Sequence, residues 1–345
     1  MSNTNIETIL FIGDVHIKYR NLMDLDKLEE KMMQMKDISF IVIAGDVLDT
    51  HEIIQCQLMN RAYKLIKELK KVAPVYILVG NHDYINNQQF LTSNHWMGGM
   101  KEWDRVHVID YPLRVVGESG HVFALVPYVP PGRLVEALDK LNDWKNVACV
   151  FAHQEIRNCK MGHIKSTDGD AWDAEWPMIV SGHIHERQNV GKNVLYPGSV
   201  LNHSFGSDNQ GISKLTFQGG VMSEERVDIG LEKKRIIYEK VNNVGNIPKE
   251  KLVIENKLCL SGRREDIKRF KNTKEYTNLT SKGIKVTFKL LSDDNVMDVS
   301  ASVDDKCKDK CKDKCKDAAF SVILGKLIAS QRDDDLEKDF IQIKV

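Results

Sequence analysis

The stretch Leu78-Val79-Gly80-Asn81-His82-Asp83 decides how the rest of the chain is interpreted. It closes a short apolar run, 75–79, whose β-branched and aromatic side chains and terminal glycine predict a buried strand. An amide, an imidazole and a carboxylate follow in three consecutive positions. Because open α/β sheets bind their ligands at the carboxyl ends of their strands, this loop is placed for chemistry.

Two apolar runs before this stretch predict strands of the same kind. Residues 8–13 lead into Asp14-Val15-His16, and residues 38–44 lead into Gly45-Asp46-Val47-Leu48-Asp49. Apolar residues at helical spacing lie between the strands, over 25–35 and 58–69. Strand, helix, strand, helix, strand predicts parallel pairing with right-handed crossovers.

The region from 106 to 227 predicts mainly strands. Two of them deliver histidines: 147–152 leads into His153, and 178–181 leads into Gly182-His183-Ile184-His185. Later strands, 212–217 and 221–227, flank a Gly-Gly turn and predict a hairpin. Parallel-type strands early and antiparallel-type strands late predict an α/β fold with two sheets packed face to face and helices outside.

The composition excludes several classes of protein. An apolar share of 42% is ample for a core, and 345 residues favour one large domain with a smaller one. Net charge is zero, so any attraction to nucleic acid must be local. Seven cysteines without a disulfide pattern, no secretory signal and no apolar run of about 20 residues predict a reduced, cytoplasmic protein that does not enter a membrane.

The composition changes after about residue 230. We therefore predict two domains, 1–230 and 231–345, the second a small α+β unit with a helix over 265–276 and a strand over 284–290. Residues 261–290 hold nine Lys or Arg and three acids. This excess contacts a phosphate backbone or forms an ordinary solvated helix face; the basic residues concerned are Arg263, Arg264, Lys268, Arg269, Lys271 and Lys274.

A four-residue repeat occupies 306–317 and places Cys307, Cys311 and Cys315 four residues apart. On a helix this spacing gives a stripe of thiols that could hold a thiophilic metal. A repeat of Lys, Cys and Asp has no apolar partners, however, which favours a solvated segment.

The polar residues that follow the five strands form one set with metal-ligand chemistry. Imidazole, carboxylate and amide ligands together suit manganese, iron or zinc rather than calcium. Two such ions about 3.5–4 Å apart need a shared carboxylate to offset their repulsion, and Asp46 is the best candidate. A free histidine beside the pair can protonate a leaving oxygen.

These motifs, over roughly residues 7–230, resemble the five signatures of the calcineurin-like metallophosphoesterases. The resemblance implies a four-layer αββα sandwich with a dinuclear centre. One metal would be held by Asp14, His16, Asp46 and His185, and the other by Asp46, Asn81, His153 and His183. His82 would be the proton donor, with Asp83 as the acceptor that fixes its ring. Asp49 is a loop cap or a catalytic residue.

Within the family, the chain resembles the SbcD-type exonucleases of phages and large viruses. The likeness lies in 45–50, 80–83, Tyr196-Pro197-Gly198-Ser199 and Ser204-Phe205-Gly206. It implies manganese-dependent cleavage of DNA, with Fe, Zn or Mg as other candidate metals, an SMC-like ATPase partner, a homodimer and a phage- or virus-infected cell as the setting. Phosphoprotein phosphatases have Arg-Gly where this chain has Thr50-His51, so a bidentate phosphate clamp is missing.

Two other functions stay open at this point. One is a phosphodiesterase or phosphatase acting on a small molecule or a protein, and the other is a non-catalytic binding module on the same scaffold. The segment 157–176 is too long for a simple connection and is interpreted as a substrate-facing loop. Its Trp172 and Trp176 either stack on bases or pack in a core.

Overall fold

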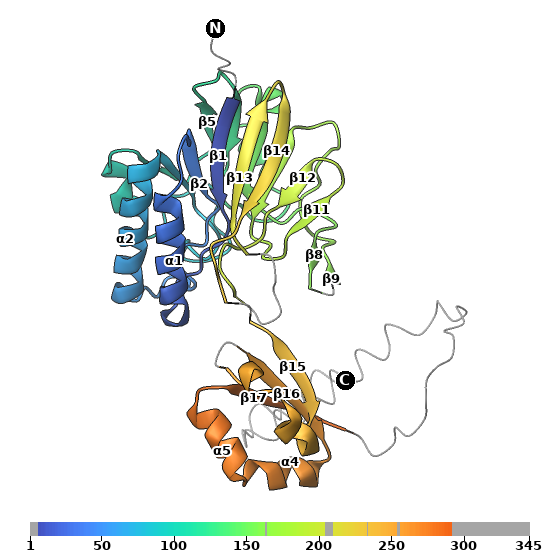
Figure 1. Cartoon of the computed structure of the whole chain (residues 1–345). Coiled ribbons are helices and arrows are strands. Elements are labelled where there is room, and N and C mark those ends of the chain that lie inside the picture. Colours follow the sequence, from blue (N-terminus) through green and yellow to red (C-terminus); the bar gives the residue numbers. More distant parts are fainter. Residues whose placement is uncertain (1–5, 163, 204–209, 233, 254–255, 292–345) are drawn as a thin grey trace, which may run out of the picture. The chain divides into compact units, whose positions relative to one another are not determined.

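The computed structural model describes residues 6–162, 164–203, 210–232, 234–253 and 256–291, and two six-stranded sheets form its larger part (Figure 1). The first sheet has the order β14-β13-β1-β2-β3-β4 and the second the order β11-β12-β10-β7-β6-β5. The strands of the first sheet are β1 (Ile6–Ile12), β2 (Phe40–Ile43), β3 (Val75–Leu78), β4 (Val106–Ile109), β13 (Ile212–Gln218) and β14 (Val221–Val227). Those of the second are β5 (Leu113–Val116), β6 (Val122–Leu125), β7 (Cys149–His153), β10 (Met178–Gly182), β11 (Gln188–Val190) and β12 (Val194–Tyr196).

Strand register brings the polar loops to one edge. In the first sheet β1, β2 and β3 run parallel, with Ile12 opposite Ile43 and Ile43 opposite Ile77. In the second sheet β7 and β10 run parallel, with His153 opposite Gly182. The predicted parallel pairing of the early strands is confirmed, and the loops that follow them leave the sheets at matching levels.

Aromatic side chains fill the space between the sheets. Phe11 on β1 stacks on Phe151 of β7 with ring centroids 6.0 Å apart, and Phe123 on β6 lies 5.8 Å from the same ring. All three side chains are fully buried. Burial on both faces explains why these strands read as continuous apolar runs rather than alternating ones.

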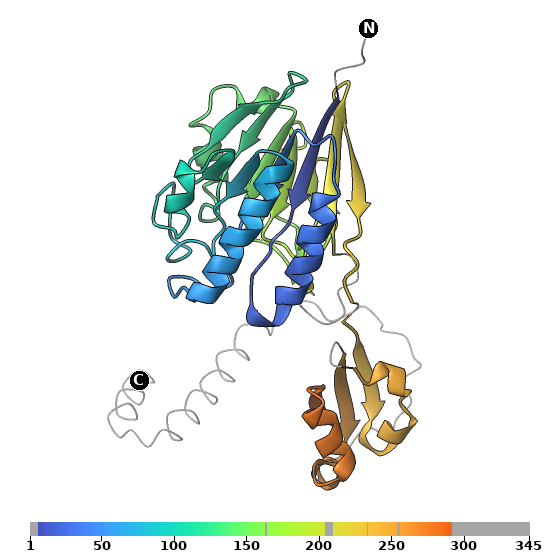
Figure 2. The same cartoon turned by 60° about the vertical axis from the view of Figure 1, so that its left-hand side comes forward.

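Helices cover the outer face of the first sheet. Helices α1 (Leu22–Met33) and α2 (Cys56–Val72) lie side by side across it (Figure 2). Apolar residues at helical spacing, such as Leu28 and Leu65, are completely buried against the strands. Within the described residues, the outer face of the second sheet carries a short α-helix, α3 (Leu134–Leu138), a 3-10 helix at Trp144–Asn146 and loops. The predicted αββα sandwich is therefore confirmed, with one thin outer layer.

Three tryptophans complete that thin layer. Trp172 and Trp176 pack against Trp144 with ring centroids 5.7 and 5.1 Å away, and Trp172 Nε1 donates to the carbonyl of Pro177. Of the two roles considered for Trp172 and Trp176, the structure therefore shows packing. The tip of the same segment is a small hairpin of β8 (Lys160–Met161) and β9 (Ile164–Lys165).

The C-terminal part that the structure describes has its own sheet and its own core. Strands β15 (Ile236–Lys240), β16 (Lys257–Gly262) and β17 (Lys285–Leu290) pair in parallel around buried residues such as Leu258 and Phe270. The boundary at 230 stays a prediction. The repeat at 306–317 lies outside the described residues.

The single helix predicted over 265–276 is wrong. The structure has two helices, α4 (Arg264–Lys271) and α5 (Lys274–Ser281). The break falls at Thr273, whose side chain accepts a hydrogen bond from the backbone N–H of Tyr276 at 3.2 Å and so caps α5.

Among the helices of the described ranges, none has both the length and the apolar character needed to cross a membrane.

Candidate metal centre

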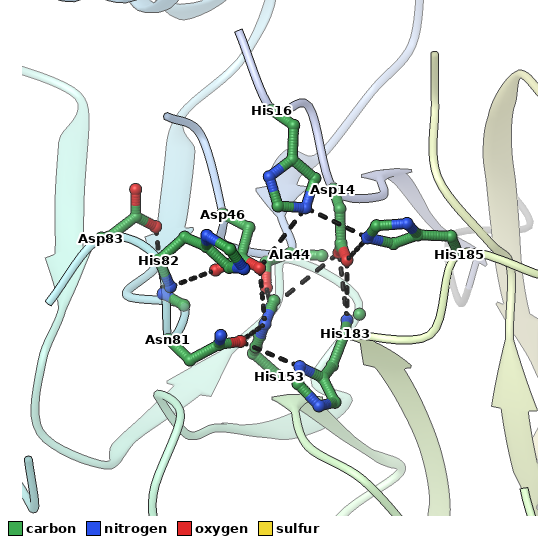
Figure 3. A network of polar contacts seen from close by, with 12 residues as sticks. Asp14, His16, Ala44, Asp46, Asn81, His82, Asp83, His153, His183 and His185 are labelled. Carbon is green, nitrogen blue, oxygen red and sulfur yellow. Dashed lines mark hydrogen bonds and ion pairs between the residues drawn. The ribbon is translucent and has the colours of Figure 1, made fainter. Parts of the chain in front are cut away.

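The seven residues predicted as metal ligands meet at one place, where loops of both sheets converge (Figure 3). Three of the loops follow β1, β2 and β3 of the first sheet. The second sheet contributes the last residue of β7 and the loop after β10. Candidate ligand atoms fall into three overlapping groups: Asp14, His16 and His185; His16, Asp46 and His82; and Asp46, His153 and His183.

The first group joins β1 to the loop after β10. His16 Nε2 lies 3.0 Å from His185 Nε2, and His185 Nε2 lies 3.3 Å from Asp14 Oδ2. Two imidazole nitrogens that face each other at this distance need a proton or a cation between them. The backbone N–H of His183 donates to both oxygens of Asp14 at 3.1 and 3.0 Å, which fixes the carboxylate.

The third group, Asp46, His153 and His183, gathers around the amide oxygen of Asn81. This atom lies 3.0 Å from His153 Nε2 and 2.9 Å from His183 Nδ1. His153 Nδ1 donates to the carbonyl of Ala44 at 2.7 Å, so the Nε2 atom is the one that faces the centre. A backbone acceptor on the far nitrogen is the usual way in which a metal-binding histidine is oriented.

Asp46 connects the first group to the third. Its Oδ2 lies 3.5 Å from His16 Nε2 and 3.4 Å from His153 Nε2. Its Oδ1 accepts a hydrogen bond from the backbone N–H of His82 at 2.8 Å. One oxygen is thus held by the protein and the other faces both histidine groups, as a bridging carboxylate requires.

The donor set fits two divalent cations. Each group offers imidazole nitrogens and oxygen donors, which together suit borderline metals. Asp14, His16, Asp46, Asn81 and His153 are nearly inaccessible to solvent. Among the described contacts, no basic side chain other than the histidines neutralises Asp14 or Asp46. Buried carboxylates of this kind are normally paired with cations or coordinate metals.

The backbone at the centre is unusual. His16, Asp46 and His183 have positive φ angles of 43°, 48° and 76°. Residues other than glycine rarely adopt this left-handed backbone conformation. Gly80 packs so closely on Asp46 that a Cβ atom there would overlap its Oδ1 and its backbone nitrogen. Local geometry of this type persists where surrounding contacts enforce it, and it concentrates at functional sites.

Comparison with known proteins identifies the family. A family model described as calcineurin-like phosphoesterase matches residues 7–187. The chain belongs to the calcineurin-like phosphoesterases. It is 43% identical over 278 residues to "Putative phosphoesterase 244L" of Invertebrate iridescent virus 6, covering 77% of this chain and 98% of that protein. It is 40% identical over 298 residues to "Putative phosphoesterase 078R" of Invertebrate iridescent virus 3, covering 83% and 85%.

The family resemblance inferred from the motifs is thereby confirmed. As a calcineurin-like phosphoesterase, the protein is a hydrolase that acts on phosphoesters. Members of this family typically bind two divalent metals, in agreement with the ligand groups described above. The assignment of each residue to one ion or the other stays a prediction.

Burial and charge set the protonation of the phosphoesterase site. Burial would raise the pKa of Asp46, but the imidazoles of His153, His16 and His82 hold it well below its usual range. Burial would lower the pKa of His153, yet Asp46 and Asp14 raise it to about 9. A cation that binds His153 Nε2 therefore displaces a proton.

His183 differs from His153 in its protonation. Burial, followed by the charge of His153, lowers the pKa of His183 to about 4. Its ring is therefore neutral near pH 7 and offers a lone pair to a metal.

His82, the predicted proton donor, lies beside Asp46. One of its ring nitrogens is within 4.8 Å of ligand atoms of His16 and Asp46. Its Nδ1 donates to the carbonyl of Asp49 at 2.8 Å, and its ring stacks on His51 with centroids 4.7 Å apart and planes at 15°. Burial lowers the pKa of His82. The Asp49 carbonyl and the His51 ring thus set its orientation.

The predicted contact of Asp83 with the His82 ring is wrong. Asp83 instead accepts hydrogen bonds from the backbone N–H groups of Val47 and Gly80, both at 3.1 Å, and from Trp96 Nε1 at 2.9 Å. The buried carboxylate ties the loop after β2 to the loop after β3. A backbone carbonyl, which no sequence motif reveals, takes the role that was expected of Asp83.

Asp49 has contacts beyond those of a loop cap. Its Oδ1 lies 3.2 Å from His16 Nδ1 and 2.6 Å from Lys18 Nζ. Burial would raise the pKa of Asp49, but these two neighbours lower it to about 2. The ionised carboxylate thus holds the far side of a candidate metal ligand, while the backbone carbonyl of the same residue holds His82.

His203 is a site residue that the sequence analysis missed. Its Nε2 donates to the carbonyl of Asp14 at 3.0 Å, and its ring packs edge-on against His16 at 5.0 Å and tilted against His185 at 5.1 Å. Burial lowers its pKa to about 3, so the neutral ring donates through Nε2. The sequence signal that could have marked His203 as a site residue is its position, four residues after the Tyr196-Pro197-Gly198-Ser199 stretch that ends a strand.

Proposed function

We propose that this phosphoesterase is a dinuclear-metal-dependent phosphodiesterase that cleaves DNA, with manganese as the working metal. The observation that carries the proposal is the position of Asp46, whose Oδ2 lies between His16 and His153 while His82 is fixed alongside. Hydrolysis of a phosphodiester at two metals needs a carboxylate that both cations share and a proton donor beside it, and Asp46 and His82 match these two requirements.

The residues of the chain divide the work. Asp14, His16, Asp46 and His185 would hold one ion, and Asp46, Asn81, His153 and His183 the other. When bound, the ions supply Lewis acidity and a template for in-line attack on phosphorus. In its protonated form, with a proton on each ring nitrogen, His82 would donate the Nε2 proton to the leaving oxygen, while its Nδ1–H stays on the Asp49 carbonyl.

Two features support a nucleic-acid substrate over a phosphoprotein. The sequence over 45–50 and 80–83, together with Tyr196-Pro197-Gly198-Ser199, resembles the SbcD-type nucleases. In phosphoprotein phosphatases an arginine that clamps phosphate follows the second aspartate, whereas here Asp49 is followed by Thr50 and pairs with Lys18. An SMC-like ATPase and a second copy of the chain are the partners that this reading implies.

A substrate panel tests the proposal. Protein loaded with Mn²⁺ is compared on linear double-stranded DNA, single-stranded DNA, RNA, bis-p-nitrophenyl phosphate and p-nitrophenyl phosphate. We expect DNA cleavage that is lost in His82→Gln and kept in His107→Gln, a matched change of an exposed histidine on β4. Intact DNA under all conditions would overturn the proposal, and turnover of the aryl esters alone would assign a small phosphoester substrate.

A further inference from the structure

A cavity of about 240 Å³ opens beside the metal centre, between the loop after β1 and the loop after β2. Its apolar lining comes from Ile17, Leu48 and Leu58, of which the first two are fully buried. Polar lining comes from Lys18, Asp49, Thr50 and Gln55, and Tyr19 completes it with a ring that is 55% exposed. The cavity thus has an apolar base and a polar rim with one accessible aromatic ring.

Asp49 joins this cavity to the catalytic groups. It lines the cavity, contacts His16 through its carboxylate, and accepts a hydrogen bond from His82 Nδ1 through its carbonyl. A substrate phosphate next to His82 therefore has this cavity as its neighbour on the Asp49 side. The part of the substrate attached to that phosphate is the natural occupant.

We propose that the cavity binds the nucleobase next to the cleaved phosphate, on the His82 side of the centre. This inference rests on the proposed function, since it takes the substrate to be a nucleotide chain. A volume of about 240 Å³ is below the roughly 300–1,000 Å³ of sites for drug-sized ligands, so one ring system fills it. Tyr19 offers a face on which a base stacks.

The charges of the lining favour a neutral ring over a second phosphate. Lys18 is the one cation among the lining residues, and it is paired with Asp49 at 2.6 Å. The lining therefore has no net charge for an anion. Gln55 offers an amide with both donors and an acceptor, and within the described residues this side chain makes no hydrogen bond of its own, so it is available to the edge of a base.

Direct binding of adenosine tests the cavity without any turnover. Titration followed by saturation-transfer NMR is carried out in EDTA, so that no metal chemistry enters. We expect saturable binding that weakens about 5- to 100-fold in Leu58→Trp, which fills the cavity, and in Tyr19→Ala, which removes the stacking ring. Leu113→Trp, a matched change at an exposed leucine on β5, leaves binding unchanged. Circular dichroism confirms that the variants fold.

Cleavage of oligonucleotides gives the second readout. An abasic sugar replaces one nucleotide at a time on either side of the cleaved bond, and we expect kcat/KM to fall about 5- to 100-fold at one position only. In the Tyr19→Ala variant, an abasic sugar at that position should no longer lower kcat/KM.

The outcomes separate the two proposals. If adenosine binding depends on Leu58 and Tyr19 but the protein leaves DNA intact, the cavity does bind a nucleobase and the proposed DNA cleavage is refuted. DNA cleavage that ignores the abasic sugar, or adenosine binding that both variants leave unchanged, overturns the cavity.

Discussion

Replacing Asp83 by alanine is expected to destabilise the fold rather than disable the proton donor. The buried carboxylate accepts from four N–H groups: those of Val47, Gly80 and Trp96 lie at 2.9–3.1 Å, and that of Leu48 at 3.4 Å. Each buried donor that loses its partner costs about 1–3 kcal/mol. Burial and the charge of Asp46 raise the pKa of Asp83 to about 6, so removal of the carboxyl also relieves part of a desolvation cost. We therefore expect a net loss of about 3–5 kcal/mol.

Thermal unfolding in EDTA, followed by circular dichroism, measures this loss without a contribution from metal binding. For a domain of this size the expected decrease in Tm is about 6–20 °C. Asp83→Asn keeps one acceptor oxygen but turns an amide N–H₂ toward a backbone donor, so it should lie between wild type and Asp83→Ala. Asp168→Ala is the control, because that side chain is exposed and, within the residues that the structure describes, its one hydrogen bond comes from the neighbouring Thr167 hydroxyl.

The pH dependence of turnover provides the refutation. If Asp83 acted on the His82 ring instead of on the two loops, Asp83→Ala would shift the pH profile of kcat and leave Tm within about 2 °C of wild type, since no backbone donor would lose its partner. That result would refute the assignment of Asp83 to the backbone of the two loops.

Three further changes test other parts of the structure. His82→Gln should lower phosphodiester turnover about 10²- to 10⁴-fold with Tm unchanged, and a turnover within threefold of wild type, measured with bis-p-nitrophenyl phosphate, would contradict a proton-donor role. Gly80→Ala should abolish turnover and weaken Mn²⁺ binding, measured by calorimetry, because the added Cβ displaces Asp46; wild-type affinity would show that the loop adapts. Adding Mn²⁺ at about 1,000 times its Kd to EDTA-treated protein should stabilise it by about 4 kcal/mol in urea unfolding, and an unchanged midpoint would argue against a preformed metal site.

The positions of the candidate ligands were predictable because the sequence places them directly after parallel strands. Once β1, β2 and β3 pair in register, Asp14, Asp46 and Asn81 have to leave the sheet at the same edge. The polar residues needed no long-range information beyond strand pairing, so a local pattern was sufficient.

Other features depended on tertiary contacts that sequence patterns do not encode. The orientation of His82 comes from a backbone carbonyl, and Asp83 is used to hold two loops together. His203 reaches Asp14 across a separation of 189 residues. The break between α4 and α5 did have a local signal, the capping side chain of Thr273, but apolar spacing obscured it.

The left-handed backbone at His16, Asp46 and His183 has a consequence for attempts to engineer this protein. Each such residue carries a conformational cost of about 1–3 kcal/mol that glycine would not have. A library selected only for heat resistance would therefore retain glycine wherever the lost side-chain contacts cost less than the backbone strain. The survivors would be sturdier and inert, so selection for robustness has to be paired with selection for turnover at every round.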